Sequence, residues 1–223
     1  MKPKKANVYI TGNQQSYDKP AGLHVRQRAD EDRFRHREDV EIYQCIEWKE
    51  DMETYASMLY QEQVKQLIIC AYSYGGGYGM RKLCDEIQKR NKKLRKRWQA
   101  KGQKFRGHRH PDEISVVAVV LCDAVGRNRY IPTEGLFAKL LYPFQVRSIT
   151  DMIYVHVPDV VENVFGLRQR EVRPKGHKWK WRGQKIEPPT YVTDLDQTRL
   201  DHFNIDESAR WNALVDEVQS RFF

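Results

Sequence analysis

The sequence predicts an α/β fold, in which a mostly parallel sheet carries helices on both faces and forms a three-layer sandwich. Segments that are apolar throughout alternate along the 223-residue chain with segments of helical periodicity. Strands that are apolar on both faces are typical of parallel sheets covered by helices. Strands joined by hairpins more often alternate apolar and polar residues. Hydrophobic residues make up 40% of the chain, which is enough for the core of one domain spanning residues 1–223.

The elements follow from the period of the apolar residues. The strand-like runs are short and apolar, whereas the helix-like segments repeat their apolar residues every three or four positions. The predicted strands are residues 7–12, 40–48, 66–71, 114–125 and one within 146–158. The predicted helices are residues 49–65, 76–99 and 207–222. The polar segment 13–39 is predicted to be a long loop with at most a short helix.

Composition restricts the location and the chemistry. The chain has no apolar run near the roughly 18 residues that span a bilayer. Its N-terminus lacks the pattern of a signal peptide, so we expect a cytoplasmic protein, with export by another route left open. The four cysteines are widely spaced and form no CxxC or Cys/His cluster, which predicts buried free thiols and no metal site. We expect no cofactor.

The stretch CAYSYGGGYG (residues 70–79) lies between a predicted strand and a predicted helix. A phosphate-binding P-loop would need a lysine and a hydroxyl after its glycines, but Met80 and Arg81 follow here. A dinucleotide-binding motif would need a different glycine spacing. A nucleophile elbow needs small residues two positions before and after its serine, and Ala71 and Gly75 satisfy this. Ser73 is therefore either a nucleophile or a turn serine that caps the following helix.

A nucleophilic serine needs an acid and a histidine, which in this kind of fold follow it in that order. Asp123 ends the most apolar predicted strand, at the sheet edge where functional residues of parallel sheets gather. The alternative reading of Asp123 is a turn or helix-capping aspartate. His202 lies in a late loop before the last predicted helix and is the candidate base.

The other histidines lie in a predicted strand, in a basic surface-like loop, or in charged loops before the acid. They are His156, His177, His24, His36, His108 and His110. We expect solvated side chains at the loop positions and a structural role for the strand histidine.

Four segments, in this order, resemble the α/β-hydrolase superfamily, and more narrowly its lipase-like and esterase-like serine hydrolases. They are AYSYGGGYG (71–79), LCDAVGRN (121–128), VPDVVENVFGLRQRE (157–171) and HFNID (202–206). The resemblance implies a carboxylic ester hydrolase acting on a small-molecule or lipid ester, with phospholipids and thioesters included.

The resemblance also implies residue roles. Ser73 would be the nucleophile, His202 the general base, and Asp123 the acid that orients it, with Asp159 as the alternative acid. The oxyanion would be held by the backbone N–H of Tyr74 and by one from the first-strand turn, at Gly12 or Asn13.

The net charge of +9 predicts attraction to polyanions. Its strongest source is the segment 89–110, predicted as a basic helix end and loop, and a second basic stretch lies within 170–200, a lid or an insertion loop. The candidate polyanion-binding residues are Lys92, Lys93, Arg95, Lys96 and Arg97. They form either a solvated helix end or a surface for anionic lipid or nucleic acid. The alternative function is thus a non-catalytic nucleic-acid- or polyanion-binding protein on a hydrolase-like fold, in an oligomeric state that the sequence leaves open.

Overall fold

The computed structural model describes residues 3–12, 22–100, 110–125, 154–169, 176–186 and 205–223. Within them, a parallel sheet of six strands runs in the order β2-β1-β4-β5-β7, and β3 pairs with the carboxyl end of β1. The strands are β1 (Lys4–Thr11), β2 (Val40–Ile42), β3 (Ile46–Glu47), β4 (Val64–Tyr72), β5 (Ser115–Cys122) and β7 (Val164–Leu167). The central strands β4 and β5 are almost entirely buried, as their apolar runs predict.

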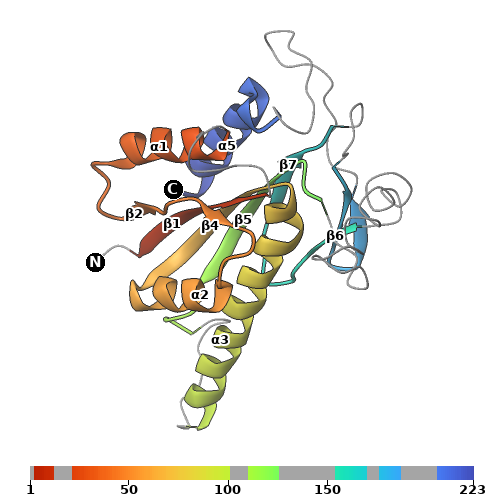
Figure 1. Ribbon diagram of the computed structural model, residues 1–223. Coiled ribbons are helices and arrows are strands. Elements are labelled where there is room, and N and C mark those ends of the chain that lie inside the picture. The colour runs from red at the N-terminus through yellow and green to blue at the C-terminus, as the bar shows by residue number, and fades with distance from the viewer. Residues whose placement is uncertain (1–2, 13–21, 101–109, 126–153, 170–175, 187–204) are drawn as a thin grey trace.

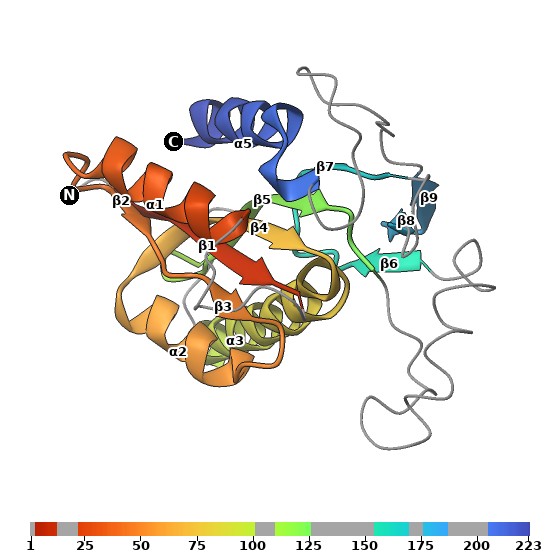
Figure 2. The same cartoon turned by 45° about the horizontal axis from the view of Figure 1, so that its top comes forward.

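Helices cover both faces of this sheet (Figures 1 and 2). On one face lie α1 (Leu23–Phe34) and α5 (Ala209–Phe222), and on the other α2 (Met52–Gln61) and α3 (Met80–Ala100). Each face has its own apolar core: Leu23 and Trp211 belong to one cluster, and Leu59 and Leu83 to the other. The prediction of a mostly parallel sheet between two helical layers is confirmed.

Two predicted strands differ from the structure. The segment 40–48 is divided into β2 and β3. The strand within 146–158 is β6 (Tyr154–Val157), and it belongs to a separate three-stranded sheet with β8 (Lys178–Trp181) and β9 (Gln184–Ile186). In the main sheet, the strand that pairs with β5 on the side away from β4 is β7. That close pairing requires Gly166, because a Cβ there would lie 2.0 Å from the carbonyl oxygen of Leu121.

The helix α1 is longer than the short helix that the sequence allowed in 13–39. Its inward face is mostly polar: His24, Arg26, Gln27 and Asp30 are buried, with Leu23 and Phe34 at the two ends of the helix. An apolar stripe, which is the usual signal of a buried helix face, is therefore missing from this segment.

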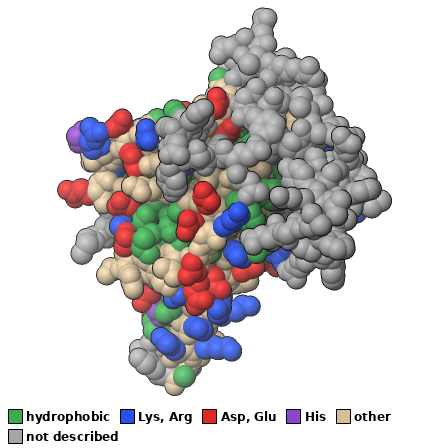
Figure 3. Space-filling model, viewed as in Figure 1, with side chains coloured by type: hydrophobic (Ala, Val, Ile, Leu, Met, Phe, Trp, Pro, Cys, Tyr) green, Lys and Arg blue, Asp and Glu red, His purple; other side chains and the backbone are tan. Residues whose placement is uncertain are grey.

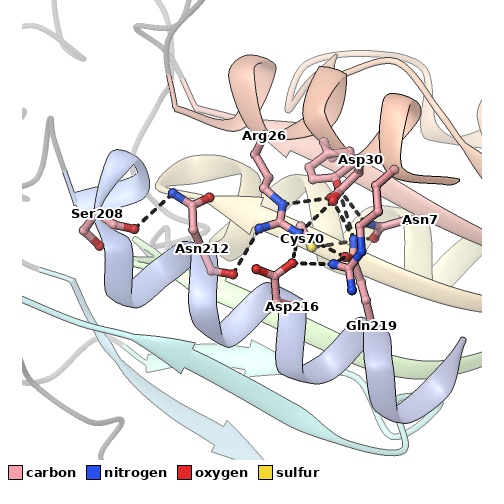
Figure 4. A network of polar contacts seen from close by, with 10 residues as sticks. Asn7, Arg26, Asp30, Cys70, Ser208, Asn212, Asp216 and Gln219 are labelled. Carbon is pink, nitrogen blue, oxygen red and sulfur yellow. Dashed lines mark hydrogen bonds and ion pairs between the residues drawn. The ribbon is translucent and has the colours of Figure 1, made fainter.

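A buried polar network accompanies the apolar contact between α1, α5 and the sheet (Figure 4). Arg26 donates from Nε to Asp30 at 2.9 Å and from a terminal nitrogen to Asp216 at 2.7 Å. Gln219 donates to the Asp30 carboxylate at 2.7 Å, and the Tyr9 hydroxyl donates to the same carboxylate. Because Asp30 accepts from three elements at once, it joins α1, α5 and β1.

None of the four cysteines, all of which lie in the described part of the chain, forms a disulfide, and all are buried as predicted. Burial raises the pKa of the Cys70 and Cys84 thiols. Thiols in this state are poor nucleophiles.

We expect Asp30→Asn to lower the free energy of unfolding by about 3 kcal/mol, because it leaves the buried Arg26 without its main counter-charge. Urea unfolding followed by circular dichroism measures the change. Asp32→Asn on the same helix is the matched control, since Asp32 pairs with Arg35 at an exposed position and such pairs contribute about 1 kcal/mol or less. Equal effects of the two substitutions would contradict the role of the network.

Candidate functional site

The chain turns sharply at Ser73, between the end of β4 and the π-helix η1 (Gly75–Gly79), which continues into α3. Ser73 is buried and has a φ of 52°. Its N–H donates to the carbonyl oxygen of Cys122 at 3.1 Å. Its own carbonyl oxygen accepts from the N–H groups of Gly76, Gly77 and Val125 at 3.1, 3.2 and 3.0 Å. The turn is therefore fixed from both the helix side and the β5 side.

The glycines of this turn are required by close approach of the backbone. A Cβ at Gly75 would lie 2.1 Å from the carbonyl oxygen of Ile10, and one at Gly76 would lie 2.6 Å from the Cβ of Ala124. The start of η1 is thus inserted between the carboxyl ends of β1 and β5. This is the role that the elbow pattern predicts for a small residue two positions after the serine.

Gly12, a predicted oxyanion residue, lies directly against the serine. A Cβ at Gly12 would be 2.7 Å from the Cβ of Ser73 and 3.1 Å from its Oγ. Tyr74 has helical backbone angles, and its ring packs against Trp48 with centroids 5.6 Å apart. Asn13 lies outside the described residues. The first-strand turn and the serine elbow therefore meet at one point.

Four non-glycine residues of the described chain have a positive φ, and two of them lie in ordinary turns. Gln63 precedes β4, and Arg182 is in the β8–β9 hairpin. The other two are Ser73 and Asp123, at 52° and 42°, which follow adjacent parallel strands. Strain of this kind costs about 1–3 kcal/mol and gathers at functional sites. The positive φ of Ser73 and Asp123 therefore indicates that the carboxyl ends of β4 and β5 form the candidate site.

Asp123 is fully buried, and described neighbours hold both of its carboxylate oxygens. Oδ1 accepts the backbone N–H of Gln169 at 2.9 Å, and Oδ2 accepts from Gln169 Nε2 at 3.2 Å. A Cβ at Gly176 would lie 2.1 Å from Oδ1, so the chain entering β8 runs directly past the carboxylate. The carboxylate thus faces β7 and the segment that leads into β8.

His202, the predicted base, lies outside the described residues. Ile205, three positions later, is buried in the same core cluster as Cys122. His177 was expected in a surface-like loop, and that expectation is wrong. It is 2% exposed, follows Gly176 directly, and donates its backbone N–H to the carbonyl oxygen of Ala124 at 2.8 Å. Gly176, which precedes His177, lies against the Asp123 carboxylate. Among the described histidines, His177 is therefore the one whose backbone passes next to this acid.

Two further expectations for histidines were wrong, because His24 and His110 are also buried. His24 lies in the first turn of α1. Burial and the nearby Arg28 lower its pKa, and Glu47 opposes this shift. Glu47 pairs with Thr11 at the carboxyl end of β1, so His24 belongs to the same edge of the sheet as Gly12. The sequence pattern did not indicate this because residues 13–39 carry no apolar period.

Asp159, the alternative acid, lies at the opposite edge of the sheet. It lines a cavity of about 240 Å³ together with Ser115, the first residue of β5. Ser115 is at the amino end of β5, and the carboxyl end of this eight-residue strand lies beside Ser73. The two ends of β5 are roughly 23 Å apart. The structure therefore does not bring Asp159 to Ser73, because the strand that precedes it belongs to the small sheet.

The five predicted polyanion-binding residues lie on the last turns of α3, at the far end of this helix from the serine. Among the described residues, no group of three or more His, Cys, Asp or Glu side chains is arranged to hold a metal ion. No described helix has the length and apolar character needed to cross a bilayer.

No protein-family model matches the chain, and no curated protein matches its sequence. The site is therefore interpreted from its own geometry: a strained serine between a buried parallel strand and a glycine-rich helix, flanked by a first-strand turn and a buried aspartate.

We expect Gly75→Ala to lower the free energy of unfolding by at least about 2 kcal/mol, because its Cβ meets a backbone carbonyl that cannot yield easily. Gly183→Asn is the control. Nothing lies within 4 Å of a Cβ at Gly183, and asparagine tolerates its φ of 77°. Thermal and urea unfolding measure both. A Gly75→Ala protein as stable as the wild type would contradict the close approach of η1 to β1.

His24 predicts a pH dependence of stability. The pKa of His24 is lower in the folded protein than its ordinary value near 6.5. As the pH falls below that value, the histidine of the unfolded chain is protonated first, and this protonation favours unfolding. The stability of the wild type should therefore fall between pH 7 and pH 5 relative to that of His24→Asn. Urea unfolding across this range tests it, with His36→Asn, an exposed histidine, as control. Parallel curves for wild type and His24→Asn would contradict the prediction.

Proposed function

We propose that the protein is a serine hydrolase that cleaves a carboxylic ester through an acyl-enzyme on Ser73. The observation that carries the proposal is the positive φ of Ser73 at the turn after the central strand β4, next to the strained and buried Asp123. A serine that only capped a helix would not need this conformation, because N-cap residues have extended backbone angles.

The proposed mechanism has two steps. In the first, Ser73 Oγ attacks the ester carbonyl carbon while a histidine takes the hydroxyl proton, and the same histidine then protonates the departing alcohol. In the second, water attacks the acyl-enzyme and releases the acid and the free serine. The developing oxyanion would be held by the backbone N–H groups of Tyr74 and of Gly12, which lies against the serine.

Asp123 fits the role of the orienting acid for a physical reason. A fully buried carboxylate is costly unless it is held by donors, and the Gln169 backbone and side chain supply them. The carboxylate is thus positioned without relying on the histidine. Its partner is proposed to be His202, as the resemblance implies, with His177 as the rival because of its burial beside Gly176.

We expect Ser73→Ala to abolish labelling by a fluorophosphonate probe and to lower the kcat for p-nitrophenyl butyrate by about 10³-fold or more. Ser57→Ala, which removes a half-buried hydroxyl on α2, is the control and should label as the wild type does. A folded wild-type protein that never labels between pH 6 and 9 would refute the proposal.

The identity of the base is tested by comparing His202→Ala with His177→Ala in the same assay. Loss of the true base should lower kcat/KM by about 10³-fold, whereas loss of the other histidine should change it by less than about tenfold. If both variants keep wild-type activity, the serine–histidine mechanism is wrong for this chain.

A further inference from the structure

The carboxyl-terminal half of α3 carries four exposed cations on one face. They are Lys92, Lys93, Lys96 and Arg97. Side chains four positions apart lie above one another on a helix, so these residues form two adjacent rows. Like charges in this arrangement destabilise a helix. In Figure 3, Lys and Arg side chains gather over this end of α3, and Figure 1 shows the helix extending past α2 and the sheet there.

Two cations close to these four on α3 are neutralised by ion pairs. Arg95 forms a two-point ion pair with Glu113, with both N–O distances at 2.5 Å, and Lys89 lies 3.3 Å from Glu86. Within the described residues, none of the four forms an ion pair. Lys92 also lines the cavity below α3, together with acids such as Glu162, whereas Lys93, Lys96 and Arg97 are not among the residues that line it. The net positive charge of the outer face therefore remains available to an external anion.

The opposite face of α3 is fully used by the fold. Leu83 and Ile87 are buried against the sheet, and Asn91 binds the backbone of Ile114 through two hydrogen bonds of 3.0 and 3.2 Å. Trp98, the aromatic side chain nearest the cations in sequence, packs against His110 with ring centroids 4.3 Å apart. The apolar side chains of the first half of α3 are thus engaged with the sheet, and Trp98 is engaged with His110.

This arrangement discriminates between classes of anionic partner. A helix that binds at a lipid interface inserts an apolar face, and that of α3 covers the sheet. A protein that binds single strands offers aromatic rings on which bases stack, and Trp98 is already packed on His110. Within the described part of α3, rows of cations without such groups suit the regularly spaced phosphates of a duplex.

We propose that this face of α3 binds the phosphate backbone of double-stranded nucleic acid without reading its base sequence. The face lies at the far end of a 21-residue helix from Ser73, about 30 Å away along the helix axis. The docked duplex is therefore no substrate of the serine site, and the proposal is independent of ester hydrolysis.

The test measures binding of a fluorescent random-sequence DNA duplex by anisotropy between 50 and 200 mM KCl. Four phosphate contacts predict a slope of log K against log salt of about −3.6, which is roughly a 150-fold loss of affinity over this range. The variant with Lys92, Lys93, Lys96 and Arg97 all changed to Gln should bind at least about tenfold more weakly at 50 mM KCl. It should remain folded, because the substitutions remove like-charge repulsion from the helix.

The control variant changes four exposed cations elsewhere to Gln and loses the same charge. They are Arg35, Lys49, Lys82 and Arg221. The control should keep the salt slope of the wild type. The proposal is overturned if the wild type does not bind the duplex at 50 mM KCl, or if the two variants lose binding equally. It is also overturned by tighter binding of single-stranded DNA, or if only phosphatidylglycerol vesicles are bound through these residues.

Discussion

The carboxyl edge of the sheet depends on the carbonyl oxygen of Ser73. Three backbone N–H groups, from Gly76, Gly77 and Val125, converge on it and join β4 to η1 and to the segment after β5. A peptide held in this way cannot rotate without breaking contacts on both sides. The left-handed conformation of the serine is therefore imposed by its surroundings, which is the condition under which backbone strain persists in a folded protein. The position of the serine Cβ at this edge is therefore set by backbone geometry.

The parts of the fold that sequence reasoning predicted are those specified by local apolar pattern. The runs of β4 and β5 are long and apolar enough to indicate buried parallel strands. In contrast, β7 has four residues, and its pairing with β5 depends on the missing side chain of Gly166, which no periodicity indicates. The helix α1 gives no apolar signal because its buried face is built from groups such as Arg26 and Asp30, whose partners lie far away in the sequence.

The same distinction holds at the site. Ser73 and Asp123 were predicted because each directly follows an apolar strand, and a strand end fixes a residue at the functional edge of a parallel sheet. The burial of His177 depends on Ala124, more than fifty positions earlier, so a local pattern of basic and aromatic residues suggested the surface instead. Asp159 was misplaced for a topological reason. The strand before it pairs within the small sheet, and the chain then passes the amino end of β5.

The polar network between α1 and α5 has a consequence for how the chain folds. The Tyr9 hydroxyl and Gln219 are 210 positions apart, and Arg26 and Gln219 are 193 apart, so these contacts close very long loops. Closing such loops costs entropy before the contacts return it, which slows the formation of non-local pairs. Until α5 docks, α1 presents a largely polar face to the sheet, and only Leu23 and Phe34 supply buried apolar side chains. We therefore expect the layer formed by α1 and α5 to become fixed after β4 and β5 have paired.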